Sequence, residues 1–249
     1  MVYNLLKIIW IAILWLDLIL FTLFMYTLSF LPKKWTSSYY SHLFQSWCWA
    51  FIRALGVNLK LHEKNQYPLP KHFILIGNHP SLFEDLGMPA LFKARFLAKR
   101  ELKDWWFVGR MSVATGTLYV KRESKESRKK AREQLIDTLK KGHNIALYPE
   151  GGCKGRRLYL PFYQGVFEIA LTTNVPILPV FLHYEAQEAF EWKTEETVIQ
   201  KLRAIAFAQN KTVNYYIYDA IDPKQFQTKE AFCEYVQNLY LLWQTEYLE

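Results

Sequence analysis

Residues 72–85, HFILIGNHPSLFED, carry the clearest fold signal in this chain. The apolar run over residues 72–77 predicts a buried strand, and Pro80 then favours the start of a helix. Residues 81–84, SLFE, also match the capping box, in which the glutamate reaches back to a backbone N–H. The two interpretations are compatible, because a cap also fixes where the helix begins relative to His79.

His79 stands at the exit of the predicted strand with two carboxylates a few residues later. Histidine acts as a general base near neutral pH, especially when an acid steadies the imidazolium. A helix that starts at Pro80 places Glu84 one turn away, on the side nearest His79, while Asp85 is rotated about 100° further round. We therefore expect Glu84 to be the partner and Asp85 the reserve. Ser81 is a weaker candidate nucleophile, because no base is clearly placed to activate it.

The rest of the chain alternates short apolar runs with helical patterns, which predicts an α/β fold. We expect a mixed, mostly parallel sheet of about seven strands with helices on both faces, preceded by an N-terminal membrane helix. The predicted strands are residues 57–63, 72–77, 94–99, 116–122, 144–149, 176–184 and 213–221. The predicted helices are residues 81–92, 124–141, 162–174 and 229–248. Ligands of such sheets bind at the carboxyl ends of the strands.

Residues 5–31 are mostly apolar, with Asp17 as their only acid and Lys7 near the start, and the run exceeds the roughly 20 residues that cross a bilayer. Asp17 would be costly at the centre of the bilayer, so a tilted or partly embedded helix is the alternative. Lys33 and Lys34 follow directly, and the positive-inside tendency places the chain after them in the cytoplasm. We expect a protein of the cytoplasmic (inner) membrane whose catalytic domain lies on the cytoplasmic side.

The next segment has an aromatic residue or a leucine at every fourth position, which predicts an amphipathic helix up to residue 55. Such a helix suits either the lipid interface or packing on its own domain. Its apolar positions are Trp35, Tyr39, Leu43, Trp47, Phe51 and Leu55. We therefore divide the chain into a membrane anchor with an interfacial helix over residues 1–55 and a second domain over residues 56–249.

The 249 residues carry a formal net charge of +8, which nucleic acid, an anionic membrane or an anionic small substrate could each explain. The apolar N-terminus makes membrane lipids the favoured partner, and we expect no nucleic acid. The three cysteines are odd in number and far apart, which indicates a reducing compartment and neither a disulfide framework nor a zinc site.

Two further motifs also lie at predicted strand ends. Arg122 follows the strand GTLYVKR, and residues 150–152, Glu-Gly-Gly, follow the strand NIALYP. Lys154, Arg156 and Arg157 come next. Glycines free the backbone to turn tightly. A glycine turn followed by basic side chains is typical of a phosphate-binding loop, or cradle.

Taken in order, these motifs resemble the blocks of the glycerolipid acyltransferase family, whose best-known members are the 1-acylglycerol-3-phosphate acyltransferases. Residues 78–84, NHPSLFE, resemble the block N-H-x-S-x-x-D, and residues 116–122 resemble G-x-x-F-I-x-R. Residues 148–152, YPEGG, are similar to the start of F-P-E-G-T-R-S, and residues 175–180 resemble V-P-I-x-P-V. The resemblance covers about residues 55–185.

The resemblance implies a membrane-bound O-acyltransferase that needs no metal and no cofactor. The donor would be acyl-CoA or an acyl-acyl carrier protein, and the acceptor a lysophospholipid, most simply 1-acylglycerol-3-phosphate. It assigns His79 as base and Glu84 as its partner. The residues that it implies in substrate binding are Asn78, Ser81, Arg122, Glu150, Gly151, Gly152, Lys154 and Arg156.

Three positions depart from the family pattern: Glu84 replaces its aspartate, Cys153 its arginine and Gln164 a common lysine. The last two remove positive charge, which indicates a change of acceptor. Two other functions stay open from the residues alone. One is a lipid-binding protein that keeps the fold without turnover, and the other is hydrolysis of the thioester or ester by water.

Overall fold

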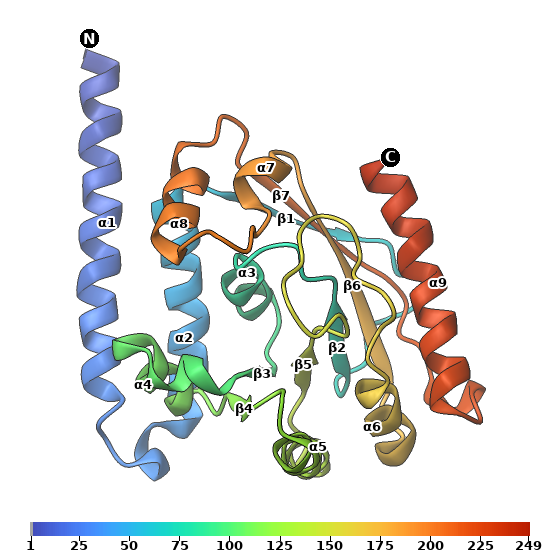
Figure 1. The fold of residues 1–249 in the computed structure, drawn as a ribbon. Helices are drawn as coiled ribbons and strands as arrows, with labels where there is room; N and C mark the ends of the chain where they lie inside the picture. The colour runs from blue at the N-terminus through green and yellow to red at the C-terminus, as the bar shows by residue number, and fades with distance from the viewer. Residues whose placement is uncertain (1) are drawn as a thin grey trace.

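The structure is a computed structural model that describes residues 2–249. Within those residues the sheet has seven strands in the order β1-β7-β6-β2-β5-β3-β4 (Figure 1). The strands are β1 (Asn58–Glu63), β2 (Ile74–Gly77), β3 (Arg95–Lys99), β4 (Leu118–Val120), β5 (Ile145–Leu147), β6 (Ile177–Tyr184) and β7 (Thr212–Ile217). Neighbouring strands are parallel except β6 and β7, which pair antiparallel. The predicted mixed, mostly parallel sheet is confirmed, and each predicted range overlaps one strand, with β7 beginning one residue before its predicted range.

Helices cover both faces of this sheet, as the alternating strand–helix pattern predicts (Figure 1). The helices are α1 (Val2–Leu28), α2 (Lys33–Leu55), α3 (Glu84–Leu91), α4 (Trp106–Ala114), α5 (Lys125–Lys140), α6 (Gly165–Thr173), α7 (Gln187–Phe190), α8 (Val198–Phe207) and α9 (Lys229–Leu248), with 3-10 helices η1 (Arg100–Asp104) and η2 (Pro223–Gln225). Successive side chains of a strand point to opposite faces. Accordingly, Leu75 packs in the core with α2 and α3, whereas Ile74 and Ile76 pack with α5, α6 and α9.

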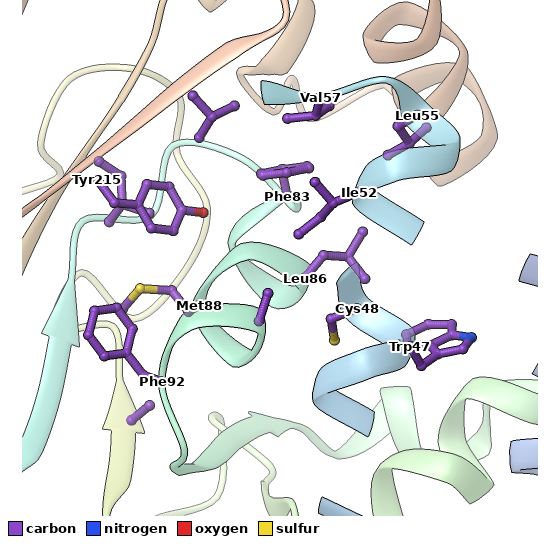
Figure 2. Close-up of a cluster of buried hydrophobic side chains, with 14 of the residues drawn as sticks. Trp47, Cys48, Ile52, Leu55, Val57, Phe83, Leu86, Met88, Phe92 and Tyr215 are labelled. Carbon is purple, nitrogen blue, oxygen red and sulfur yellow. The ribbon is translucent and has the colours of Figure 1, made fainter. Parts of the chain in front are cut away.

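The second half of α2 belongs to the core of the domain. Figure 2 shows Ile52 of α2 pointing toward Phe83, which directly precedes α3, with Tyr215 of β7 in the same cluster. Cys48, Ile52 and Phe83 are each at most 1% exposed. This half of the helix therefore packs on the core formed by residues 56–249, although the sequence division placed it with the anchor; packing on the protein is the second of the two environments that its periodicity allowed.

Helix α1 presents an apolar surface to the outside. Its stretch Leu5–Leu28 is long and apolar enough to cross a membrane, and 11% of its most apolar window is buried. The chain then turns, and α2 runs back along α1 (Figure 1). Hydrogen bonds join the two helices: the Tyr40 hydroxyl donates to the Met25 carbonyl at 2.9 Å, and Trp47 Nε1 donates to Thr22 Oγ1 at 2.8 Å. The side chains of Lys33 and Lys34, on which the expected orientation depends, lie outside those that the structure describes.

Two parts of the fold differ from the sequence prediction. Helix α3 begins at Glu84 rather than at residue 81, because residues 78–83 form an irregular turn. Helices α4, α7 and α8 were not predicted. They lie in the connections from β3 to β4 and from β6 to β7, where exposed apolar side chains such as Trp106 and Ile199 obscure the helical pattern.

Helix α3 sits close to β7 because Gly87 faces Tyr215. A Cβ at residue 87 would overlap the Tyr215 hydroxyl, so we expect Gly87→Ala to lower the free energy of unfolding by about 1 to 3 kcal/mol. Gly165→Ala is the matched control, because the described residues leave open space around its added methyl group. Denaturant unfolding in detergent would measure both. Equal stability of the two variants would contradict this packing.

Candidate active site

The predicted motifs meet at one edge of the sheet. Strands β2, β5, β3 and β4 are parallel neighbours, so their carboxyl ends point the same way. His79 comes two residues after β2, Arg122 two after β4, and Glu150 three after β5. Segments from distant parts of the chain therefore converge there, as expected for an α/β sheet.

His79 and Glu84 face each other. His79 Nδ1 lies 3.5 Å from Glu84 Oε2, and the Glu84 side chain has no exposed surface. The other carboxylate oxygen, Oε1, accepts hydrogen bonds of 2.8 Å from the Ser81 backbone N–H and from the Tyr184 hydroxyl. Both Nδ1 and Oε2 are buried without another hydrogen-bond partner among the described residues. Oε2 is thus available to His79, and the second ring nitrogen, Nε2, is available to a substrate.

The bond from the Ser81 N–H to Glu84 is the backbone contact that the capping box predicts. The Ser81 hydroxyl, however, accepts from the Phe83 N–H, so it serves the turn before the helix. The capping box itself is not formed, because the N-cap of α3 is Phe83 and no side chain caps the helix there. Glu84 therefore closes the turn before α3 and also faces His79.

The position of His79 is fixed by an aromatic ring stacked on the imidazole and by a hydrogen bond from the His79 backbone. The ring of Tyr148 stacks on it with centroids 4.1 Å apart and planes 9° apart. Glu150 Oε1 accepts from the His79 N–H at 2.6 Å, and its Oε2 accepts from the Tyr159 N–H at 2.7 Å. Glu150 was expected to contact the substrate, but its carboxylate instead ties the two loops together.

Burial shifts the protonation of these groups. Loss of water raises the pKa of Glu84 to about 8 and that of Glu150 to about 7. Burial lowers the pKa of His79, against the attraction of the nearby Asp85 and Glu150 carboxylates. The ring is therefore neutral at neutral pH, which is the state that a general base requires.

Asp85 is placed differently from Glu84. Its side chain is exposed, one position further round the first turn of α3, while the carboxyl group that faces the His79 ring is that of Glu84. Asp85 acts on His79 through space, as the first of the charges that raise its pKa. The geometry therefore favours Glu84 over Asp85 as the partner of His79, as expected.

Asn78 and Ser81, expected near the substrate, are buried and occupied by the protein. Asn78 Nδ2 donates to the Leu182 carbonyl at 2.9 Å, and Asn78 Oδ1 accepts from the Leu182 N–H at 2.7 Å. Asn78 therefore ties the exit of β2 to β6. Ser81 has no exposed surface.

The cationic side chains divide into two groups. Arg122 Nη1 lies 3.2 Å from the position that a Cβ would take on Gly152, so the second and third motifs are in contact. Lys154 lies beside them, with its Cε 3.9 Å from the same position. Arg156, in contrast, is bound by both oxygens of Glu191, at 2.7 and 3.0 Å. Of the predicted cradle, the structure brings Arg122, Gly152 and Lys154 together.

Gly151 has another role. It adopts a left-handed backbone with φ 70°, and the ring of Tyr163 lies against it, so that a side chain at this position would overlap the ring. The glycine turn is therefore closed on one side by an aromatic ring.

Sequence reasoning missed three residues of this site: Tyr148, Tyr184 and Glu191. The alternation of β6 contained a signal for one of them, because Tyr184 shares a face with Leu182 toward α3. Among residues 2–249, no group of three or more His, Cys, Asp and Glu side chains has the arrangement of a metal site.

Comparison with known proteins gives a consistent result. The family model described as Acyltransferase matches residues 58–183. A 1-acyl-sn-glycerol-3-phosphate acyltransferase of Neisseria gonorrhoeae is 29% identical over 136 residues, covering 53% of this chain and 52% of that protein. A lyso-ornithine lipid O-acyltransferase of Rhodobacter capsulatus is 23% identical over 201 residues, covering 75% of this chain and 71% of that protein. The chain thus spans about half the length of the first of these relatives.

The fold has a solved counterpart. The crystal structure of the 1-acyl-sn-glycerophosphate acyltransferase PlsC of Thermotoga maritima aligns with a TM-score of 0.66 and 21% identity, over 91% of this chain and 94% of that one. At this identity the likeness concerns the fold, including the sheet and the helices that place the site.

The raised pKa of Glu84 makes folding depend on pH. Between its ordinary value of 4.5 and about 8, the folded protein keeps a proton that the unfolded chain releases, so stability falls as the pH rises. Glu84→Gln removes this loss, and we expect the variant to be more stable than wild type at pH 8 by on the order of 2 to 4 kcal/mol. The difference should vanish as the pH falls well below 4.5, where wild-type Glu84 is protonated in both states.

Thermal and denaturant unfolding across this pH range would measure the effect, with the exposed Glu195→Gln as the matched control. A Glu84→Gln protein less stable than wild type at pH 8 would show that the buried carboxylate is ionised and stabilising.

Proposed function

The chain belongs to the acyltransferase family, whose model matches just over half of it, and on that premise we propose that it moves a fatty acyl group from a thioester to the hydroxyl of a lysophospholipid. The observation that carries the proposal is the position of Glu84, which faces His79 Nδ1 and leaves Nε2 for the acceptor. Arg122 and Gly152 at the same edge supply a cationic contact.

We propose one proton path for this reaction. The active form has Nδ1–H donated to ionised Glu84 and an unprotonated Nε2. Nε2 takes the proton of the acceptor hydroxyl, whose oxygen attacks the thioester carbonyl carbon. The carbon–sulfur bond then breaks, and the thiolate that leaves takes the proton back from the imidazolium. Glu84 stabilises that imidazolium while it exists.

We propose acyl-CoA or an acyl-acyl carrier protein as the donor and 1-acylglycerol-3-phosphate as the acceptor, which would give phosphatidic acid. Arg122, with its forked donors, is suited to the phosphate. Lys154 adds a second positive charge, since its exposed side chain is next to Gly152. Names of curated relatives such as the Neisseria gonorrhoeae protein support this acceptor.

A second acceptor, a lyso-ornithine lipid, is favoured by one feature of the site. Cys153 stands where the family pattern has arginine, and Arg156 is neutralised by Glu191. The cradle therefore has less positive charge than a phosphate monoester site of the family pattern. The Rhodobacter capsulatus relative, which matches three quarters of this chain, carries that substrate in its name.

The exposed apolar face of α1 supports attachment to a membrane, and we propose the cytoplasmic membrane with the catalytic domain on the cytoplasmic side. The sidedness rests on the pair Lys33 and Lys34 after the helix.

His79→Ala should lower the rate of acyl transfer by about 10²- to 10⁴-fold, the usual contribution of a general base, without unfolding the protein. Release of free thiol from the donor, measured with a lysolipid acceptor, checks this, and circular dichroism checks the fold. The exposed His143→Ala should retain the wild-type rate. Wild-type activity in His79→Ala would refute the role of His79 as the base. Loss of transfer in both variants would show that the effect is not specific to His79.

Arg122→Gln should lower kcat/KM for 1-acylglycerol-3-phosphate about 10- to 100-fold, as expected for a lost charged hydrogen bond of about 1.5 to 3 kcal/mol. The matched control is Arg157→Gln, since Arg157 pairs with Glu249 outside the cradle. A wild-type protein that acylates lyso-ornithine lipid faster than 1-acylglycerol-3-phosphate would replace the first acceptor with the second.

A further inference from the structure

Helix α4 and the residue before it expose a run of large apolar side chains that neither the core nor the site uses. Trp105, Trp106, Phe107 and Val108 are consecutive in the chain, and they are 44%, 89%, 38% and 37% exposed. Contiguous exposed apolar surface marks a contact with another phase or molecule. We call these four residues the aromatic wedge.

The fold holds the wedge outward. The helix turns Gly109 and Met111 inward, and both are buried. Gly109 lies so close to the preceding 3-10 helix η1 that a Cβ on it would overlap the Lys103 carbonyl oxygen. The Gly109 N–H also donates to the Trp105 carbonyl at 2.7 Å. Since η1 and α4 are packed this tightly, the wedge is a fixed part of the surface.

The wedge continues the apolar surface of the N-terminal helices. Helix α4 contacts α1 and α2, and it lies beside the turn between them (Figure 1). The Arg110 guanidinium stacks 3.5 Å from the ring centroid of Phe30, just after α1. Phe30 and its neighbour Leu31 are 57% and 43% exposed. One apolar surface therefore runs from α1 across this turn to α4.

The charges around the aromatic wedge indicate what it binds. Arg100, Lys103 and Arg110 are exposed beside it and outnumber the exposed acids Glu101 and Asp104. Tryptophan next to lysine and arginine suits the interface of a bilayer, where the ring lies at headgroup depth and the cation meets anionic lipid. We propose that the aromatic wedge inserts into the headgroup region of an anionic membrane, as a contact separate from α1.

This contact would turn the site toward the lipid. The wedge lies in the connection from β3 to β4, and both strands end at the edge that carries the site. Lys99, which directly precedes η1, is among the charges that lower the pKa of His79, so this connection begins close to the imidazole. A membrane-held wedge fixes that edge next to the bilayer, from which a lipid acceptor would arrive.

The test measures the depth of the wedge in a membrane and does not depend on turnover. A spin label is placed at residue 106 in the full chain, as Trp106→Cys in a Cys153→Ser background; Cys48 and Cys233 are buried. The matched control carries the label at Leu242→Cys, because Leu242 is 66% exposed on α9. Both proteins are bound to phosphatidylcholine vesicles with and without phosphatidylglycerol.

We expect oxygen to reach the label at residue 106 several-fold better than a water-soluble nickel chelate when phosphatidylglycerol is present. The label at residue 242 should remain as accessible to the nickel chelate as a label in water. Because α1 attaches both proteins equally, a label at residue 106 that stays in water on the vesicles would overturn the proposal. Dipolar broadening between labels at residue 106 would overturn it too, since it would identify a second copy of the chain as the occupant.

Discussion

The site depends on one buried carboxylate. Glu84 has no exposed surface, and its two oxygens serve three groups: the Ser81 N–H and the Tyr184 hydroxyl on Oε1, and His79 on Oε2. A carboxylate placed this way is costly unless its partners compensate for the lost water. The turn before α3, the end of β6 and the imidazole are therefore held by the same side chain.

A second buried acid, Glu150, repeats this arrangement on the neighbouring loop. Its oxygens bind the backbone N–H groups of His79 and Tyr159, so the third motif fixes the main chain of the first. Both acids have raised pKa values, of about 8 and about 7, because burial disfavours their charge. Burying these two carboxyl groups costs stability, and both lie where catalysis needs an imidazole in a fixed position. Residues that lower stability in this way are typical of functional sites.

Much of the fold was predictable, because hydrophobic periodicity and the turn residues determine strands and helices locally. The pairing of His79 with Glu84 was also anticipated, though by a different geometry. Helix α3 begins at Glu84 itself, so the carboxylate reaches the ring across a turn and not along one helical face. What remained hidden depends on partners distant in the chain, such as Glu191, which neutralises Arg156 from 35 positions away. The aromatic wedge was hidden too, since an exposed Trp106 looks like a core residue in sequence.

The role of Glu84 is tested most directly by the protonation of the His79 ring, observed by ¹⁵N NMR of the full chain with labelled histidine. We expect a neutral ring with its proton on Nδ1, facing the ionised Glu84, when the pH is above the Glu84 pKa of about 8. The Nδ1 signal should change in Glu84→Gln. A ring protonated on Nε2 alone, or unaffected by the loss of the Glu84 charge, would contradict the claim that this carboxylate prepares the base.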